Sequence, residues 1–287
     1  MKKLFILLLV ALPMVAAAQV RVVSAPAAEE KITPYDSLEN CPEYTITGMV
    51  GQELFLPPRA EHMKRFGYSN IHIMHNGHAS TPHDDVAGHT FKVVSVEQNQ
   101  NRPLDYELKL EDTQTGTNYY YSFTRPRPTW DFITLGYKAK YEAENKGKSF
   151  VALTSYFGKD FNTGNHISDK GRGSVWVFQE IIANQDEGGM GYMYTNGDNQ
   201  TIVMDTYFNK FMVRKTVIDK LKKKYGAQMC NLAVEGTIKI GMPAELVKIA
   251  KGEPKTINRA SYGEQWVYGE YAEDCIYFKN GKVTGWN

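Results

Sequence analysis

Six of the seven histidines in the chain are concentrated in one short stretch, which reads "HIMHNGHASTPHDD" at its centre. Neutral imidazoles and carboxylates are ligands of zinc and similar ions, so this run is a weak candidate for a metal site. A three-residue spacing aligns side chains only on a helix, which Gly77 and Pro82 disfavour. We therefore expect a solvated polar loop without a catalytic metal. The candidate ligands are His72, His75, His78 and His83.

Nucleophilic catalysis has little support in the sequence. The chain lacks a Gly-x-Ser-x-Gly elbow, a Cys-x-x-Cys pair and a glycine-rich phosphate loop between a strand and a helix. Cys41 is the one candidate for a thiol nucleophile, but no helix N-terminus that would lower its pKa is visible after it. We expect no enzyme activity and no cofactor. A metal- or cysteine-dependent hydrolase is the less favoured alternative.

Aromatic side chains near the end of the chain are candidates for a binding surface. Exposed rings can stack on the sugars of a glycan or anchor a protein partner. Many rings in alternating strands must instead face a core. The candidates for a binding surface are Tyr262, Trp266, Tyr268 and Tyr271.

Short strands dominate the region that precedes these aromatics. Apolar and polar residues alternate in four segments of strand length, and "TQTG" has the composition of a hairpin turn. These segments predict a β-rich module over residues 41–130. A second β-rich module with the same pattern of short strands and turns is expected over 131–207. The four segments are Gly51–Leu56, His89–Glu97, Tyr106–Asp112 and Thr117–Phe123.

The openings "VGQELFLPP", "AGHTFKVVSV" and "KGKSFVALT" share a glycine followed by an apolar alternation. This weak internal repeat is similar to the Src-homology-3-like modules of bacterial envelope proteins. The resemblance implies small barrel- or sandwich-like β modules. A single β-sandwich with repeated hairpins remains the alternative interpretation.

From about residue 208 the apolar spacing becomes helical, and Gly226 is a natural C-terminal stop. A second helix is expected between Pro243 and Gly252, and Asn280-Gly281 predicts a hairpin. Residues 208–287 are therefore predicted to form an α+β domain, in which helices pack on a three-stranded antiparallel meander. The helically spaced residues are Phe208, Phe211, Met212, Val217, Ile218, Leu221 and Tyr225.

This last region resembles the SmpA/OmlA (BamE-like) family of outer-membrane lipoproteins and the related fold of β-lactamase inhibitory protein. The resemblance covers about a fifth of the chain and implies a non-enzymatic protein that binds other proteins. It is carried by Gly241-Met242, Gly252-x-Pro254, Trp266-Val267-Tyr268, Tyr277-Phe278 and Asn280-Gly281-Lys282-Val283.

The first residues, "MKKLFILLLVALPMVAAA", have the charged start, apolar run and small-residue end of a signal peptide. We expect cleavage near Ala18-Gln19, a flexible linker over residues 19–40, and a periplasmic or secreted protein. No cysteine follows the apolar run, so no lipoprotein cysteine is expected, and the run is too short to span a bilayer. Loss of residues 1–18 changes the formal charge from +1 to −1. This balance excludes a strongly basic nucleic-acid-binding class.

In an oxidising compartment the three cysteines allow at most one intramolecular disulfide. The Cys230–Cys275 pair is the least strained choice, because both residues are expected in one domain. A disulfide between Cys41 and one of the other two cysteines is also possible, as is a protein in which all three thiols are reduced.

These features together predict a mainly β, non-catalytic envelope protein that acts through protein or cell-surface binding. A cell-wall or glycan-binding module is the alternative. The expected partner is an envelope protein or a cell-wall component.

Overall fold

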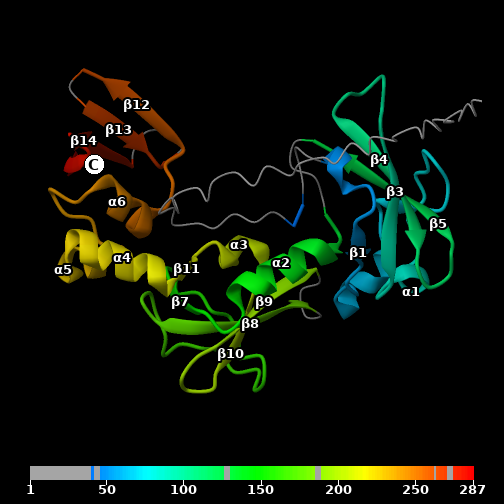
Figure 1. The fold of residues 1–287 in the computed structure, drawn as a ribbon, viewed down its shortest axis with the longest axis horizontal. Helices are drawn as coiled ribbons and strands as arrows, with labels where there is room; N and C mark the ends of the chain where they lie inside the picture. The colour runs from blue at the N-terminus through cyan, green and yellow to red at the C-terminus, as the bar shows by residue number, and fades with distance from the viewer. Residues whose placement is uncertain (1–39, 42–45, 126–129, 185–188, 262, 270–273) are drawn as a thin grey trace, which may run out of the picture. The chain divides into compact units, whose positions relative to one another are not determined.

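The computed structural model describes residues 40–41, 46–125, 130–184, 189–261, 263–269 and 274–287. The predicted signal peptide and almost all of the predicted linker lie outside these residues. Within them the chain forms three antiparallel sheets, each with two edge strands, accompanied by short helices (Figure 1). The prediction of a mainly β chain with an α+β C-terminal part is confirmed. All three sheets are open. No helix in the described part is long and apolar enough to cross a membrane.

The first sheet has six strands in the order β2-β5-β4-β3-β1-β6. Its alternating strands place Tyr119, Tyr121 and Phe123 of β5 in the core, as the period of two requires. Three short helices, η1 (Ile46–Met49), η2 (Glu61–Phe66) and α1 (His83–Val86), accompany it. The strands are β1 (Glu53–Phe55), β2 (Ile71–His72), β3 (Thr90–Gln98), β4 (Asp105–Asp112), β5 (Asn118–Thr124) and β6 (Ile133–Thr134).

The second sheet has five strands in the order β10-β9-β8-β7-β11. Helix α2 (Leu135–Asn145) packs on this sheet through Tyr141, whose ring centroid lies 5.1 Å from that of Phe178 and 5.2 Å from that of Tyr192. The sequence did not predict α2, because tyrosines rather than aliphatic residues make its buried face. The strands are β7 (Ser149–Ala152), β8 (Val175–Ala183), β9 (Met190–Thr195), β10 (Thr201–Met204) and β11 (Met212–Arg214).

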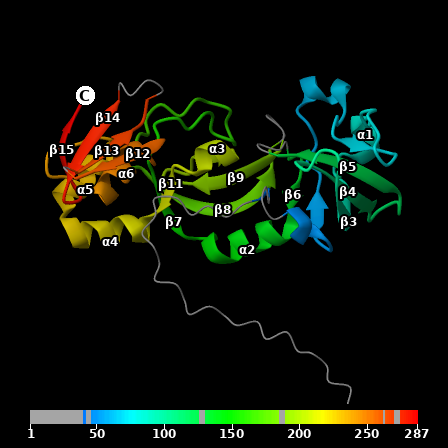
Figure 2. The same cartoon turned by 90° about the horizontal axis from the view of Figure 1, so that it is seen from above.

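The prediction of one continuous helix from residue 208 to 225 is wrong. This segment contains the end of the short helix α3 (Thr206–Asn209), then β11, and then α4 (Lys215–Tyr225). Figure 2 shows β11 beside β7, directly before α4, and Met212 is paired with Ala152. The helical spacing in the sequence therefore arises from apolar residues of three successive elements. Phe208 and Met212 join the core of the second sheet, whereas the buried Ile218 and Leu221 of α4 do not belong to that cluster.

The C-terminal part contains α5 (Ala227–Val234), α6 (Ala244–Lys251) and a four-stranded meander. The meander has one strand more than predicted, because β12 (Thr256–Ala260) is polar and largely exposed and has no apolar alternation to reveal it. The predicted hairpin is confirmed: Asn280 and Gly281 have φ values of 52° and 70°, as a type I′ turn requires. The other strands are β13 (Gly263–Val267), β14 (Cys275–Lys279) and β15 (Lys282–Trp286).

Candidate functional site

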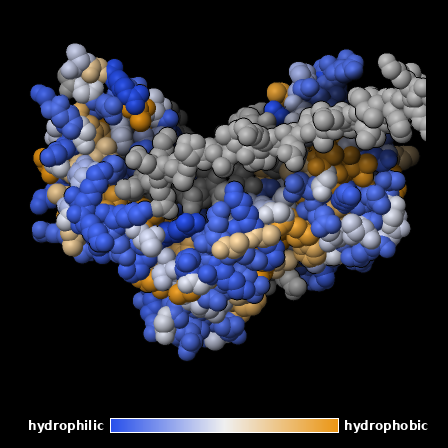
Figure 3. Space-filling model, in the orientation of Figure 1, coloured by the Kyte–Doolittle hydropathy of each residue, from blue (hydrophilic) through white to orange (hydrophobic). Residues whose placement is uncertain are grey.

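A cluster of aromatic rings reaches the surface at α3 and at the loop that follows β7. Tyr156 and Tyr207 are 58% and 60% exposed, which is high for such large side chains. The Tyr156 ring stacks on that of Phe208, with 4.7 Å between centroids. Figure 3 shows hydrophobic residues interspersed with hydrophilic ones over the face of the second sheet and its helices. We call Tyr156, Tyr207, Phe208, Lys210 and Phe211 the α3 aromatic patch.

Polar contacts on the inner side of α3 hold this patch in place. Asp205 caps the helix by accepting a hydrogen bond from the Phe208 backbone N–H (2.7 Å). Asn209 points inward, where its Oδ1 accepts a hydrogen bond from the buried Tyr194 hydroxyl (2.6 Å) and its Nδ2 donates one to the Tyr141 hydroxyl (3.3 Å). Tyr207 is therefore carried by a helix that is fixed to the core of the second sheet, and Tyr156 stacks on Phe208 of that helix.

Lys210 gives the patch a positive charge. Its ammonium lies 3.6 Å from the ring centroid of Tyr207 and 5.1 Å from that of Phe211, which are cation–π distances. No carboxylate in the described part of the chain forms an ion pair with Lys210. The patch thus combines exposed aromatic rings with one cation that has no acidic partner among the described residues.

The structure does not bring the four candidate histidines together. His72 is buried in β2, with Nδ1 2.9 Å from the Ala79 carbonyl and Nε2 3.1 Å from the Ser122 hydroxyl. His83 is buried at the start of α1, where its ring stacks on Tyr68. Of the four candidates, only His75 and His78 are exposed. The predicted polar loop is therefore wrong for His72 and His83, and the described residues contain no group of three or more potential metal ligands.

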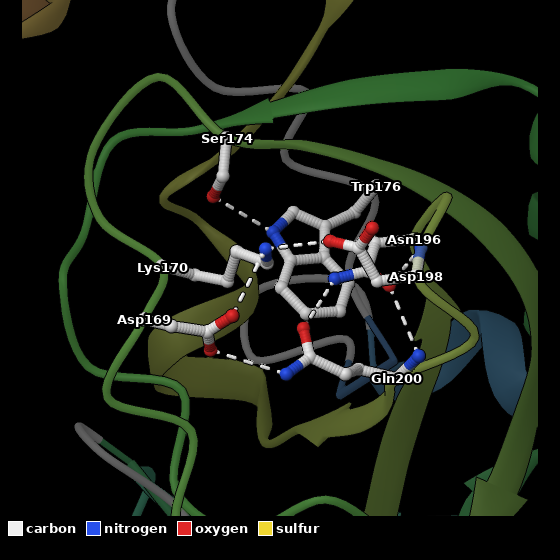
Figure 4. Close-up of polar contacts among 7 residues, drawn as sticks. All are labelled: Asp169, Lys170, Ser174, Trp176, Asn196, Asp198 and Gln200. Carbon is white, nitrogen blue, oxygen red and sulfur yellow. Dashed lines mark hydrogen bonds and ion pairs between the residues drawn. The ribbon is translucent and has the colours of Figure 1, made fainter.

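A polar network joins the loop before β8 to the turn between β9 and β10 (Figure 4). The Lys170 ammonium lies 2.6 Å from Asp198 Oδ2 and 3.1 Å from Asp169 Oδ2, and Gln200 donates a hydrogen bond to Asp169. The hydrogen bond to Asp198, together with that to Asp169, raises the pKa of Lys170. These contacts join the loop to the turn.

A second polar pair lies at the turn between β4 and β5. Asp112 is completely buried; its Oδ2 lies 2.8 Å from His89 Nδ1, and its Oδ1 accepts a hydrogen bond from the Gln114 backbone N–H (2.8 Å). Burial alone would raise the pKa of Asp112, but the hydrogen bonds from Gln114, His89 and Thr115 outweigh it and lower the pKa. The pair organises the turn, since both acceptor oxygens are occupied by local donors.

This pair predicts how stability depends on pH. A carboxyl group whose folded pKa lies below its unfolded value of 3.8 stabilises the fold above that pH and loses this contribution as the pH falls through the folded pKa. We expect the free energy of unfolding, measured by urea titration from about pH 5 down to about pH 2, to fall less steeply in Asp112→Asn than in the wild type. Asp85→Asn, which changes an exposed carboxylate, is expected to follow the wild type. Parallel wild-type and Asp112→Asn profiles would contradict this account.

The predicted aromatic surface of the C-terminal part is only partly described. Trp266 is buried, with its ring centroid 4.4 Å from that of Phe278, and its Nε1 donates a hydrogen bond to Glu264 (3.0 Å). Trp266 is therefore a core residue, because its place in β13 faces inward. Tyr268 is half-buried, and its hydroxyl donates a hydrogen bond to the Gly252 carbonyl (3.2 Å). The other two candidates, Tyr262 and Tyr271, lie outside the described residues.

Cys230 and Cys275 are not joined by a disulfide in the structure, which is one of the arrangements that the sequence leaves open. Both of these residues are buried, in α5 and β14 respectively. Burial raises the pKa of Cys230, which disfavours the reactive thiolate. Cys41 is half-buried and packs against the core of the first sheet.

Comparison with known proteins finds no matching family model, curated protein or solved structure. The resemblances to SmpA/OmlA proteins and to Src-homology-3-like modules stay predictions. Sequence reasoning missed the patch, because it assigned Phe208 and Phe211 to the buried stripe of one helix. The dense aromatic run "TYFNKF" was the signal that could have indicated it.

Proposed function

We propose that this chain is a secreted envelope protein without catalytic activity, which binds a protein partner through the α3 aromatic patch. The observation that carries the proposal is that two exposed tyrosine rings, Tyr156 and Tyr207, pack against the half-buried ring of Phe208, whose helix α3 is hydrogen-bonded to the core. Contiguous apolar surface is uncommon on soluble monomers unless it binds something. Tyrosines held in one conformation give large contact area at a low entropic cost, which is why they are frequent in protein interfaces. The signal-peptide pattern supports the envelope location.

A protein partner fits the patch better than a glycan does. A sugar stacks on an open ring face, but Lys210 covers one face of Tyr207, and the rings of Tyr156 and Phe208 cover one another. The ring edges and the remaining faces suit apolar side chains that insert between them. The cation at Lys210 favours a partner with an acidic residue beside its apolar anchor.

Competition binding tests this proposal. The partner is captured from envelope extracts on the immobilised full-length protein, and soluble protein is then added to release it. We expect the soluble double variant Tyr156→Ala/Tyr207→Ala to release the partner only at a concentration at least about 30-fold higher than the wild-type protein needs. The reason is that aromatic anchors dominate the binding energy of an interface.

Phe161→Ala is the matched control for this competition. Phe161 is 54% exposed, and among the described residues its ring is not one of those that contact the patch. This variant is expected to release the partner as the wild type does. Equal competition by all three proteins would contradict the assigned surface.

A further inference from the structure

A polar pocket opens on the first sheet, where the turn between β3 and β4 faces the loop that follows β2. Its volume is about 560 Å³, within the range of small-molecule sites. Amide, hydroxyl, imidazole and carboxylate groups dominate its lining, in contrast to the apolar walls of most sites for drug-like molecules. The lining residues used in the argument are His75, Glu97, Gln98, Asn99, Arg102 and Glu107.

Glu107 has an incomplete set of hydrogen bonds in this pocket. Its Oε1 accepts a hydrogen bond from the Asn76 backbone N–H (2.8 Å), whereas its buried Oε2 has no hydrogen-bond donor in the described part of the chain. His75 Nε2 lies 2.9 Å from Oε2, but the ring is not oriented to donate to it. A buried acceptor without a donor is costly. The His75 side chain is 52% exposed, lies 3.6 Å from Glu97 Oε2 and contacts the Tyr120 ring. Displacement of this ring would admit a donor from a ligand.

The charges of the pocket indicate which class of ligand supplies that donor. Glu97 lies directly opposite Glu107 in the β3–β4 register, and the one arginine, Arg102, is paired with Asp105 (2.9 Å). This arrangement repels phosphates and carboxylates. Amides such as Gln98 and Asn99 both donate and accept hydrogen bonds, as sugar hydroxyls do.

We propose that this pocket binds a neutral saccharide, one hydroxyl of which displaces the His75 ring and donates a hydrogen bond to Glu107 Oε2. The site lies on the first sheet and takes a small ligand. It is therefore independent of the protein partner proposed for the α3 aromatic patch, which belongs to the second sheet.

Saturation-transfer NMR on the full-length protein tests the proposal, with glucose, galactose, N-acetylglucosamine and chitobiose as neutral probes and spermidine as a cationic one. We expect saturation transfer to at least one sugar. Glu107→Gln is expected to weaken that binding about tenfold or more, because it removes a hydrogen bond to a charged acceptor. His75→Ala is expected to strengthen it, since no ring then has to be displaced.

Glu111→Gln is the matched control, because it makes the same charge change on the same strand at an exposed position. It is expected to bind sugar as the wild type does. Sugar should also slow amide hydrogen exchange over residues 97–107 of the wild-type protein, a readout that does not depend on the folding of any variant. The proposal is overturned if no sugar binds, if spermidine alone binds, if exchange over 97–107 is unchanged, or if Glu107→Gln and Glu111→Gln bind equally.

Discussion

Replacement of Trp176 by alanine is expected to lower the free energy of unfolding by about 4 kcal/mol. The Trp176 side chain is completely buried in β8, where its ring centroid lies 5.3 Å from that of Phe157. Its indole N–H donates a hydrogen bond to the Ser174 hydroxyl (2.9 Å), as Figure 4 shows. The substitution therefore leaves a large cavity and also removes the partner of Ser174. Urea titration followed by far-ultraviolet circular dichroism measures the loss.

Val175→Ala is the control for this experiment, because Val175 precedes Trp176 on the same strand and faces solvent. It is 43% exposed, so its truncation is expected to cost less than about 1 kcal/mol. Similar losses in the two variants would show that the second sheet is not packed around Trp176 as described.

Asp160→Ala is expected to lower the free energy of unfolding by about 3 kcal/mol, the largest loss after that of Trp176→Ala. Asp160 is buried, and its carboxylate accepts hydrogen bonds from the backbone N–H groups of Thr201 (2.7 Å), Thr163 (2.8 Å) and Asn162 (3.0 Å). These bonds, the one from Thr201 above all, lower the pKa of Asp160. Alanine leaves the buried Thr201 N–H without its acceptor. Urea titration at neutral pH, where Asp160 is ionised, measures the full loss.

Asp198→Ala provides the comparison for Asp160→Ala. Asp198 lies in the same region but is exposed, and its main interaction is a surface ion pair with Lys170. Such pairs contribute at most about 1 kcal/mol. The loop that contains Asp160 also carries Tyr156, so Asp160→Ala is expected to weaken partner binding whereas Asp198→Ala is not. If both variants lose the same stability, Asp160 does not anchor this loop.

The strands of the two β-rich regions were predictable because their signal is local. In β5, for example, Tyr119, Tyr121 and Phe123 face the core at a period of two, and this alternation is visible in the sequence. The hairpin at Asn280-Gly281 was predictable for a similar reason, because its positive φ values suit these two residues.

Elements without a local apolar pattern were not predictable. Helix α2 buries tyrosines, β12 is mostly exposed, and β11 is recognisable only through its pairing with β7. For α2 and β11 the deciding contacts come from residues that are distant in the sequence, whereas β12 pairs with the adjacent strand β13 and lacks only an apolar signal. A continuous helical period could therefore be read across α3, β11 and α4, although no single helix exists there.

The candidate site shows the same limit. Composition revealed many aromatic residues, but which of them reach solvent depends on tertiary packing. Trp266, expected at a surface, is buried, whereas Tyr156 and Tyr207 are exposed. The histidine run was read as one loop, yet β2 and α1 bury two of its members against different neighbours, so proximity in sequence did not become proximity in space.

Position-specific photocrosslinking in the cells that produce the protein tests whether the α3 aromatic patch binds a protein. A benzophenone side chain is introduced at Tyr207 in the α3 aromatic patch or, as a control, at Phe161, which is similarly exposed. The account predicts one discrete adduct with a protein at position 207, which purified wild-type protein competes away and Tyr156→Ala/Tyr207→Ala does not. No adduct at position 207, or the same adducts at positions 207 and 161, would contradict it.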